Sequence, residues 1–507
     1  MKIYFKNLIS YIICFILFIS VIFFFLHRVN DHLKNDLKLN YKFSYYAIPL
    51  ALSAIKGHEY NYAGYHSIKI IMPNEANRLS RNDFNALINQ IIVSDPKGKN
   101  SFNAAGGEDL GLIDFTFLAF KIFGYDVNSI TKFYCLILFF SIFLFFIHAY
   151  KKTEFYLVIT IYLLVLCLSF GNFQFYTSGL IFDRIVDTRN FSMLAVVPLL
   201  HFFFYIFILE KKFNLLIFLQ LILLNFLCFV RSSLYLEFLI IFCIYGIYII
   251  TKNLKKNNAE DLFLMNLKKI CIIILICIII LPQMTKLFVS KQQYTRYQLH
   301  HHPVTNMFRA GLIADNPTLK EKYNFNFHLN QPNIDQAIHE SGLFFYNNYF
   351  NKNLNRPQIY FLHGGIDWVE NTKLERSFIL HLITNHYDEL FKNFLYYKPI
   401  KIFEGFLYEF KIFLNNFKYI SFILLFSFFF FLIFIINFKD IQLLKIFGIS
   451  FFVILPVTLK NLFLWGNINQ YFLDLFIIYF NFIFIITFLI ISVVVNYFFK
   501  ILRKIIS

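Results

Sequence analysis

Acidic residues next to long apolar segments are the first candidates for chemistry in this sequence. Asp31 and Asp36 follow the first apolar segment in "HRVNDHLKND", and Glu108 and Asp109 precede the apolar stretch "LGLIDFTFLAFKIFG". A carboxylate can remove the proton from a hydroxyl group that attacks an electrophile. The simpler alternatives are solvated charges for Asp31 and Asp36 and helix capping for Glu108 and Asp109. We take Asp31, Asp36 and Asp109 as the candidate catalytic residues.

Basic residues suited to binding a phosphate occur in several places. The segment "FDRIVDTRNF" combines two arginines, which can clamp a phosphate, with two aspartates that can hold an acceptor or a cation. These four side chains can equally pair with one another at the surface. The segment "LHHHPVTNMFRAGL" adds histidines and an arginine, and Lys460 lies in an apolar run where a charge indicates an anionic partner. The candidate substrate-binding residues are Asp183, Arg184, Asp187, Arg189, Arg231, His301, Arg309 and Lys460.

Long apolar runs must position these residues. Of the 507 residues 58% are hydrophobic, and apolar runs of about 20 residues recur, enough to cross a hydrocarbon core of roughly 30 Å. We predict an all-α polytopic membrane protein with about 10 transmembrane helices and two large extracytoplasmic loops. All seven cysteines fall within the predicted spans, which argues against disulfides. The predicted spans are 8–27, 129–149, 154–171, 190–209, 213–230, 232–250, 269–282, 419–437, 446–465 and 472–498.

Lysine and arginine set the orientation of these spans. Basic residues gather in the short loops on one side, and both termini fall on that side, which the positive-inside rule makes cytoplasmic. The formal net charge of +17 then reflects membrane topology, and we exclude nucleic acid as a partner. We expect a multi-pass protein of the bacterial inner membrane.

Three regions follow from this layout. Residues 1–282 form an N-terminal transmembrane module that includes the first outer loop, 28–128. Residues 283–418 form a second large outer loop or lid, and residues 419–507 form a C-terminal module of three helices. Both loops contain helix-compatible stretches, "YYAIPLALSAI" and "RSFILHLITNHYDELFKNFLYY", so we expect folded caps. The stretch "FTFLAFKIFG" is too short to cross and is predicted to lie at the interface.

Several familiar catalytic motifs are missing. The sequence contains no G-x-x-x-x-G-K-[ST], no G-x-S-x-G and no H-E-x-x-H, so we expect neither an ATPase nor a serine or zinc hydrolase. The histidine run lacks the spacing of a zinc site, and we leave a divalent cation open as a cofactor. Without a nucleotide site, chemistry would use a substrate already delivered to the outer face.

Two motifs stand before the second predicted span, "YAIPLALSAIKG" and "DLGLIDFTFLAFKIFG". With these motifs the first 250 residues resemble the polytopic GT-C glycosyltransferases, which include the protein-O-mannosyltransferase and aminoarabinose-transferase relatives. The resemblance implies a polyprenyl-phosphate-linked sugar donor and a lipid, glycan or protein acceptor. It also implies a carboxylate base in the first outer loop and basic residues that hold the lipid phosphate. The family's acid before the Tyr-Ala pair is absent from "NYKFSYYA", which leaves Asp36 and Asp31 as the nearest candidates. The residues that carry the resemblance are Tyr46, Ala47, Gly57, Asp109, Gly111, Phe123 and Gly124.

Two other functions stay open. An O-antigen-type glycan polymerase or ligase shares the large outer loop and the lipid-linked substrates, and the histidines and arginine of "HHHPVTNMFRAGL" fit it. A lipid-glycan flippase or transporter would carry charges through the middle of the bundle. Apart from Lys460 and Asp474 the central spans of this chain are nearly charge-free, and the charges gather on one face. The essential residues would separate the two enzymes: the first outer loop for the glycosyltransferase, the second for the ligase.

Overall fold

The computed structural model describes part of the chain. The described residues are 47–55, 110–149 without 127, 174–175, 179–180, 191–205, 214–231, 302–325, 334–350 and 368–401, with isolated positions elsewhere. They are helical except for one minimal antiparallel pair, β1 (Gln174–Phe175) with β2 (Gly179–Leu180). The prediction of a helical chain is therefore confirmed for this part.

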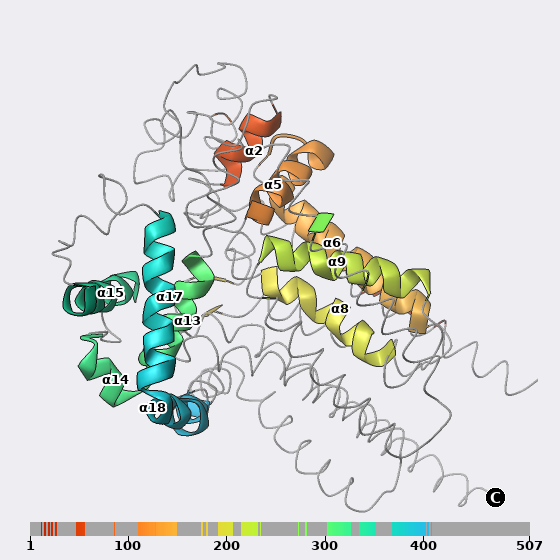
Figure 1. Cartoon of the computed structure of the whole chain (residues 1–507). Helices are drawn as coiled ribbons and strands as arrows, with labels where there is room; N and C mark the ends of the chain where they lie inside the picture. The colour runs from red at the N-terminus through yellow and green to blue at the C-terminus, as the bar shows by residue number, and fades with distance from the viewer. Residues whose placement is uncertain are drawn as a thin grey trace, which may run out of the picture.

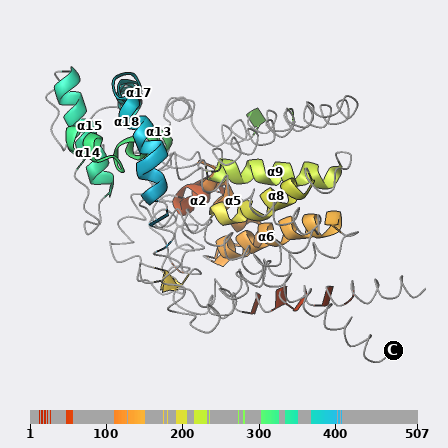
Figure 2. The same cartoon turned by 90° about the horizontal axis from the view of Figure 1, so that it is seen from below.

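The helices form two groups (Figures 1 and 2). In the first group α6, α8 and α9 lie side by side in both views, with α5 and α2 near one end. The first group consists of α2 (Ile48–Ile55), α5 (Leu110–Phe123), α6 (Asn128–Ala149), α8 (Ser192–Phe204) and α9 (Leu215–Val230). The second group consists of α13 (His302–Ile313), α14 (Pro317–Lys322), α15 (Ile334–Phe350), α17 (Trp368–Asn385), α18 (Tyr387–Lys392) and the π-helical η7 (Asn393–Tyr397).

Helix α6 is long and apolar enough to cross a membrane, over Asn128–His148. Its buried face packs on α5, α8 and α9, while a second face exposes Leu136, Phe140, Phe143 and Ile147. A helix that is apolar on its exposed side as well as its buried side fits a lipid environment. Within the described residues α6 matches the predicted span 129–149.

The other predicted spans are covered only in part. Helices α8 and α9 lie within the predicted spans 190–209 and 213–230. Helix α9 has 16 residues, fewer than a bilayer-crossing helix needs. The remaining spans fall outside the described residues, apart from isolated positions. Multi-pass topology and the three-region layout therefore stay predictions.

A tight turn joins α5 to α6. Gly124 has a φ of +85°, a left-handed conformation that glycine adopts without a Cβ penalty, and its N–H donates to the Phe120 carbonyl. The Asp126 carboxylate then accepts from the Asn128 N–H at 2.8 Å, and the Ser129 hydroxyl donates to the Gly124 carbonyl at 2.7 Å. These bonds end one helix and start the next within four residues.

The second group is built around an apolar core. Tyr323, Phe345 and Phe378 are buried there, and the rings of Phe345 and Phe378 stack with centroids 4.0 Å apart. The predicted helical stretch that begins at Arg376 is confirmed as α17, α18 and η7, and the stretch that ends at Ile55 as α2.

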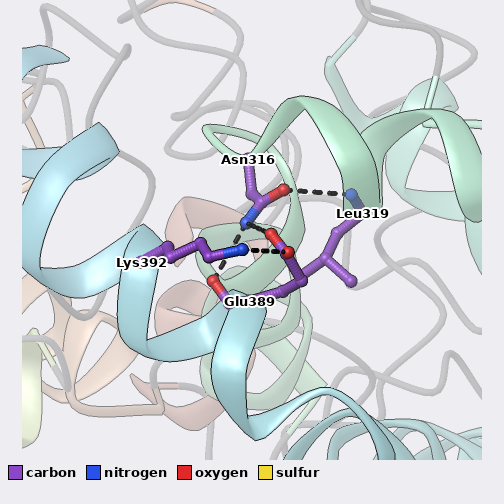
Figure 3. A network of polar contacts seen from close by, with 4 residues as sticks. All are labelled: Asn316, Leu319, Glu389 and Lys392. Atoms are coloured by element: carbon purple, nitrogen blue, oxygen red, sulfur yellow. Dashed lines mark hydrogen bonds and ion pairs between the residues drawn. The ribbon is translucent and has the colours of Figure 1, made fainter.

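A polar network fixes the start of α14 to α18 (Figure 3). Asn316 caps α14 by accepting from the Leu319 N–H at 3.1 Å, and its amide donates to the carbonyl oxygen and to Oε2 of Glu389 at 2.9 and 3.1 Å. Lys392 pairs with Oε1 of the same Glu389 at 2.7 Å. One asparagine thus satisfies a helix terminus and holds two helices together.

Candidate functional site

The N-terminus of α5 meets the C-terminus of α9 at unusually short distance. A Cβ added to Gly111 would lie 2.5 Å from the carbonyl carbon of Phe229 and 2.6 Å from the amide nitrogen of Val230. Because these are backbone atoms, no side-chain movement can make room for a larger residue. Gly111 is therefore required for this contact, which brings the end of the first outer loop onto the end of α9.

Arg231 follows this contact directly. It ends α9 in an extended conformation, donates its N–H to the Leu227 carbonyl at 2.8 Å and accepts at its own carbonyl from the Leu234 N–H at 3.0 Å. Its side chain is half-buried. Of the predicted site residues, Arg231 is thus placed at the junction of α5 and α9, and Asp109 is two positions before Gly111 in the sequence.

Most of the other predicted site residues lie outside the described part of the chain. This holds for the three candidate catalytic aspartates and for most of the candidate ligands. Their roles stay predictions. The residues concerned are Asp31, Asp36, Asp109, Asp183, Arg184, Asp187, Arg189, His301 and Lys460.

Arg309 lies inside the core of the second group. Its Nε is 2.5 Å from Oε2 of Glu375, and the side chains are 1% and 3% exposed. Its Nη1 donates to the Ser341 hydroxyl at 3.1 Å, and its guanidinium lies over the Phe378 ring with 5.1 Å to the centroid. The arginine thus joins α13 to α15 and α17 and carries its own counter-ion. A role in substrate binding remains a prediction for this residue.

Two neighbours complete the surroundings of this ion pair. A Cβ on Gly342 would lie 3.2 Å from Nη1, 3.3 Å from Nη2 and 3.5 Å from Cζ of Arg309. The guanidinium therefore packs against the backbone of α15. Burial raises the pKa of Glu375, while the charge of Arg309 and hydrogen bonds from Tyr346 and Arg309 act in the opposite direction. The carboxylate therefore depends on its partners to stay ionised inside the core.

A partly exposed histidine cluster lies at the edge of the same core. His381 is joined to the Tyr323 hydroxyl through Nε2 at 2.9 Å and accepts from the Asn385 amide at Nδ1, also at 2.9 Å. Its ring is 4.5 Å from that of Tyr349 and 5.8 Å from that of His386. These contacts assign the proton of neutral His381 to Nε2, where it is donated to Tyr323.

Burial and nearby charges act on both histidines of this cluster. Desolvation lowers the pKa of His381 and of His386, and in each case the nearby positive charges add to the effect. Within the described part of the chain, Nε2 of His386 is buried and makes no hydrogen bond. The lowered pKa values favour the neutral form of both imidazoles.

A second histidine pair lies within the first group. Asn214 caps α9 by accepting from the Ile217 N–H at 3.0 Å, and its amide lies 3.1 Å from Nε2 of His148. Nδ1 of His148 is 2.8 Å from Nε2 of His201, which is fully buried. Since the Asn214 amide is the donor, Nε2 of His148 accepts, and the Nδ1–H of His148 donates to Nε2 of His201. Neutral His201 therefore carries its own proton on Nδ1.

This chain of contacts fixes the direction of three helices. His148 is in the last turn of α6, His201 in the C-terminal half of α8, and Asn214 is the first residue before α9. Helices α6 and α8 therefore run in the same direction and α9 runs against them. Lys211 and Lys212 shortly precede Asn214. The predicted cytoplasmic side would therefore be at this end and the predicted outer side at the Arg231 end.

Sequence reasoning did not single out His148, His201, His381 or Tyr323. A lone histidine in an apolar run carries no spacing signal, and its partners come from helices that are 53 and 58 positions away along the chain. Among the described residues, no group of three or more His, Cys, Asp or Glu side chains could hold a metal ion. Comparison of the chain with protein-family models, with curated proteins and with solved structures finds no match.

Proposed function

We propose that this chain is a multi-pass membrane glycosyltransferase that acts on the extracytoplasmic face. It transfers a sugar from a polyprenyl-phosphate-linked donor to a lipid, glycan or protein acceptor. In this proposal the protein resides in a bacterial inner membrane with both termini in the cytoplasm, and its fold is of the GT-C kind.

The observation that carries the proposal is the backbone contact between Gly111 and the end of α9. It brings the end of the first outer loop to the outer end of a predicted span, where Arg231 begins the next connection. Chain connectivity keeps Asp109 close to Gly111. In this proposal an acid and a guanidinium come from neighbouring segments at one membrane boundary, as transfer from a lipid phosphate requires.

The proposed chemistry divides between these two kinds of residue. A carboxylate of the first outer loop, Asp31, Asp36 or Asp109, accepts the proton of the acceptor hydroxyl as that oxygen attacks the glycosyl carbon. The bond from this carbon to the phosphate oxygen breaks, and the polyprenyl phosphate leaves with the electron pair. A guanidinium such as that of Arg231 stabilises the charge that develops on the departing phosphate.

The exposed apolar face of α6 supports a membrane location for this chemistry. Phe143 is 55% exposed and Ile147 42% exposed, and such side chains are costly in water but favourable against lipid tails. The lipid-linked donor would then diffuse to the junction within the bilayer.

A matched pair of arginine variants tests the proposal. In proteoliposomes with a polyprenyl-phosphate sugar and an acceptor, Arg231→Gln is expected to reduce transfer on the order of 100-fold, because the leaving phosphate loses charge stabilisation. Arg376→Gln, an exposed arginine of α17, serves as the control and is expected to stay near wild-type activity. Equal activity of the two variants would remove Arg231 from the site.

A glycan polymerase or ligase is the second candidate. The observation that favours it is the cluster of His381 and His386 beside Tyr323, at a partly exposed edge of the predicted second outer loop. This function predicts that His381, and not a first-loop aspartate, is indispensable.

A further inference from the structure

The segment from α17 to residue 407 exposes a series of large apolar side chains, called the apolar stripe below. Its exposed fractions range from 38% for Ile400 to 73% for Tyr387. Soluble surfaces scatter such residues singly, whereas a continuous patch marks an interaction site. The apolar stripe consists of Leu380, Ile383, Tyr387, Phe391, Leu395, Tyr396, Ile400, Phe403 and Leu407.

The exposed apolar side chains follow helical spacing on either side of one π-helical turn, η7. Leu380 and Ile383 lie on α17, which ends at Asn385 before the non-helical His386. Steps of four residues lead from Tyr387 to Leu395, and steps of three and four from Tyr396 to Leu407. Between them the chain forms the π-helical turn η7, whose wider ring absorbs one extra residue. Pro399 follows directly, and its ring crowds the carbonyl of residue 395, which favours a wider turn before it. The π turn thus keeps both halves of the stripe on one side.

The opposite face of the segment is fixed to the core. Leu382 and Leu390 are buried there, and the amide of Asn393 donates to the carbonyl oxygens of Gly311 and Leu312 at 3.2 and 2.9 Å. Asn393 is fully buried. The segment cannot rotate its stripe inward without breaking these contacts, so the stripe needs a partner outside the described core.

We propose that the apolar stripe lies in the outer interface of the lipid bilayer, parallel to its surface. This inference rests on the membrane location proposed above. Three features select lipid as the partner. The stripe mixes tyrosine and phenylalanine with leucine and isoleucine, the composition of a membrane-interface belt. Lys392 and Lys401, 58% and 40% exposed, accompany it and pair with Glu389 and Glu404 on the same segment. Long side chains of this kind keep their charged ends in the polar headgroup layer while their stems lie along an apolar face.

The third feature is continuity with the membrane. The stripe ends at Leu407, and the next predicted span begins at residue 419, so the chain must arrive at the bilayer surface within 12 residues. A stripe in the interface places α17 and α18 at the depth of the lipid phosphates. The second outer loop is then held against the bilayer where a lipid-linked donor carries its phosphate.

Tryptophan quenching by brominated lipids tests this placement in the full-length protein. Trp368 and Trp465, the two natural tryptophans, are replaced by Phe, and a single tryptophan is introduced as Phe391→Trp or Leu395→Trp. The protein is reconstituted in vesicles of phosphatidylcholine brominated either near the headgroup or near the ends of the acyl chains. Glu321→Trp, at an exposed polar site on α14, is the control in water. Phe143→Trp, on the exposed face of α6, is the control in lipid.

The inference predicts roughly twofold quenching of both stripe tryptophans by bromines near the headgroup and weaker quenching by deep bromines, since an interfacial helix sinks about 5–10 Å. Glu321→Trp stays unquenched. If Phe143→Trp is quenched and the stripe tryptophans are not, the interfacial placement is wrong while the membrane location stands. In that case cross-linking between cysteines introduced at Leu395 identifies a second copy of the chain as the partner. If Phe143→Trp is also unquenched, the membrane location itself fails.

Discussion

The backbone of Gly111 lies directly against the backbone of Phe229, with no space for a Cβ between them. This contact ties the helix that follows the first outer loop to the helix that ends at Arg231. The proposed chemistry depends on it, because acids from one segment and a guanidinium from the other have to meet.

Gly111→Ala is expected to disrupt this junction. The added methyl group would overlap backbone atoms, and overpacking of this kind costs about 1–3 kcal/mol. Thermal unfolding in detergent should show a lowered midpoint, and transfer activity should fall by more than the loss of folded protein. Ile122→Ala, at an exposed position of the same helix, should leave both unchanged. A Gly111→Ala protein with wild-type stability would show that the two backbones are further apart.

The Arg309–Glu375 pair predicts a strong coupling between two helices. Arg309→Met leaves a buried carboxylate without its counter-ion, which costs about 3–5 kcal/mol. Adding Glu375→Met removes the orphaned charge and should restore most of that stability. Unfolding of the two single variants and the double variant measures the coupling. Additive effects would mean that the charges do not face each other in the folded protein.

Because the Lys398 side chain is buried, we expect the free energy of unfolding to increase at alkaline pH. Desolvation lowers the pKa of this buried amine to about 8, while the charge of Asp315 acts in the opposite direction. Unfolding returns the pKa to its ordinary 10.5. Between these values the folded state binds fewer protons than the unfolded state, so the free energy of unfolding increases with pH through this window. The full increase is about 3 kcal/mol.

Replacing the amine isolates this effect from other titrating groups. Lys398→Met should be more stable than wild type at pH 7 and should lose the alkaline increase, as measured by unfolding between pH 7 and pH 10. The same pH dependence in both proteins would assign the increase to other residues.

The Asn214 side chain caps α9 and contacts His148, and two substitutions can separate these contributions to stability. Asn214→Asp keeps an oxygen for the Ile217 N–H, whereas Asn214→Ala loses that cap at a cost of about 1 kcal/mol. Neither variant has an amide to donate to His148. Stability in the order wild type, Asp, Ala is expected, and Asp equal to Ala would mean that the contact with His148 outweighs the cap.

Local features of the fold followed from the sequence, whereas contacts across the chain did not. The apolar stretches that contain Ala51, Phe115 and Phe378 are helices as predicted, because apolar content and turn residues act over short distances. Arg309 shows the limit. Nothing around it indicates that Glu375, 66 positions later, occupies its guanidinium, since such a pairing depends on how α13 and α17 pack. His148 and His201 were missed for the same reason.

The most direct test of the account is mass spectrometry of polyprenyl-phosphate-linked sugars and surface glycans in a deletion strain. The strain is complemented with wild type, Asp31→Asn, Arg231→Gln or His381→Gln. The account predicts that a monosaccharide donor accumulates and one sugar disappears from a glycan, with rescue by wild type and His381→Gln but not by Arg231→Gln. If Asp31→Asn does not restore the missing sugar, Asp31 is the base. If it does restore the sugar, the base is Asp36 or Asp109. Accumulation of whole lipid-linked oligosaccharides, with His381 indispensable and Arg231 dispensable, would contradict the account and establish a polymerase or ligase.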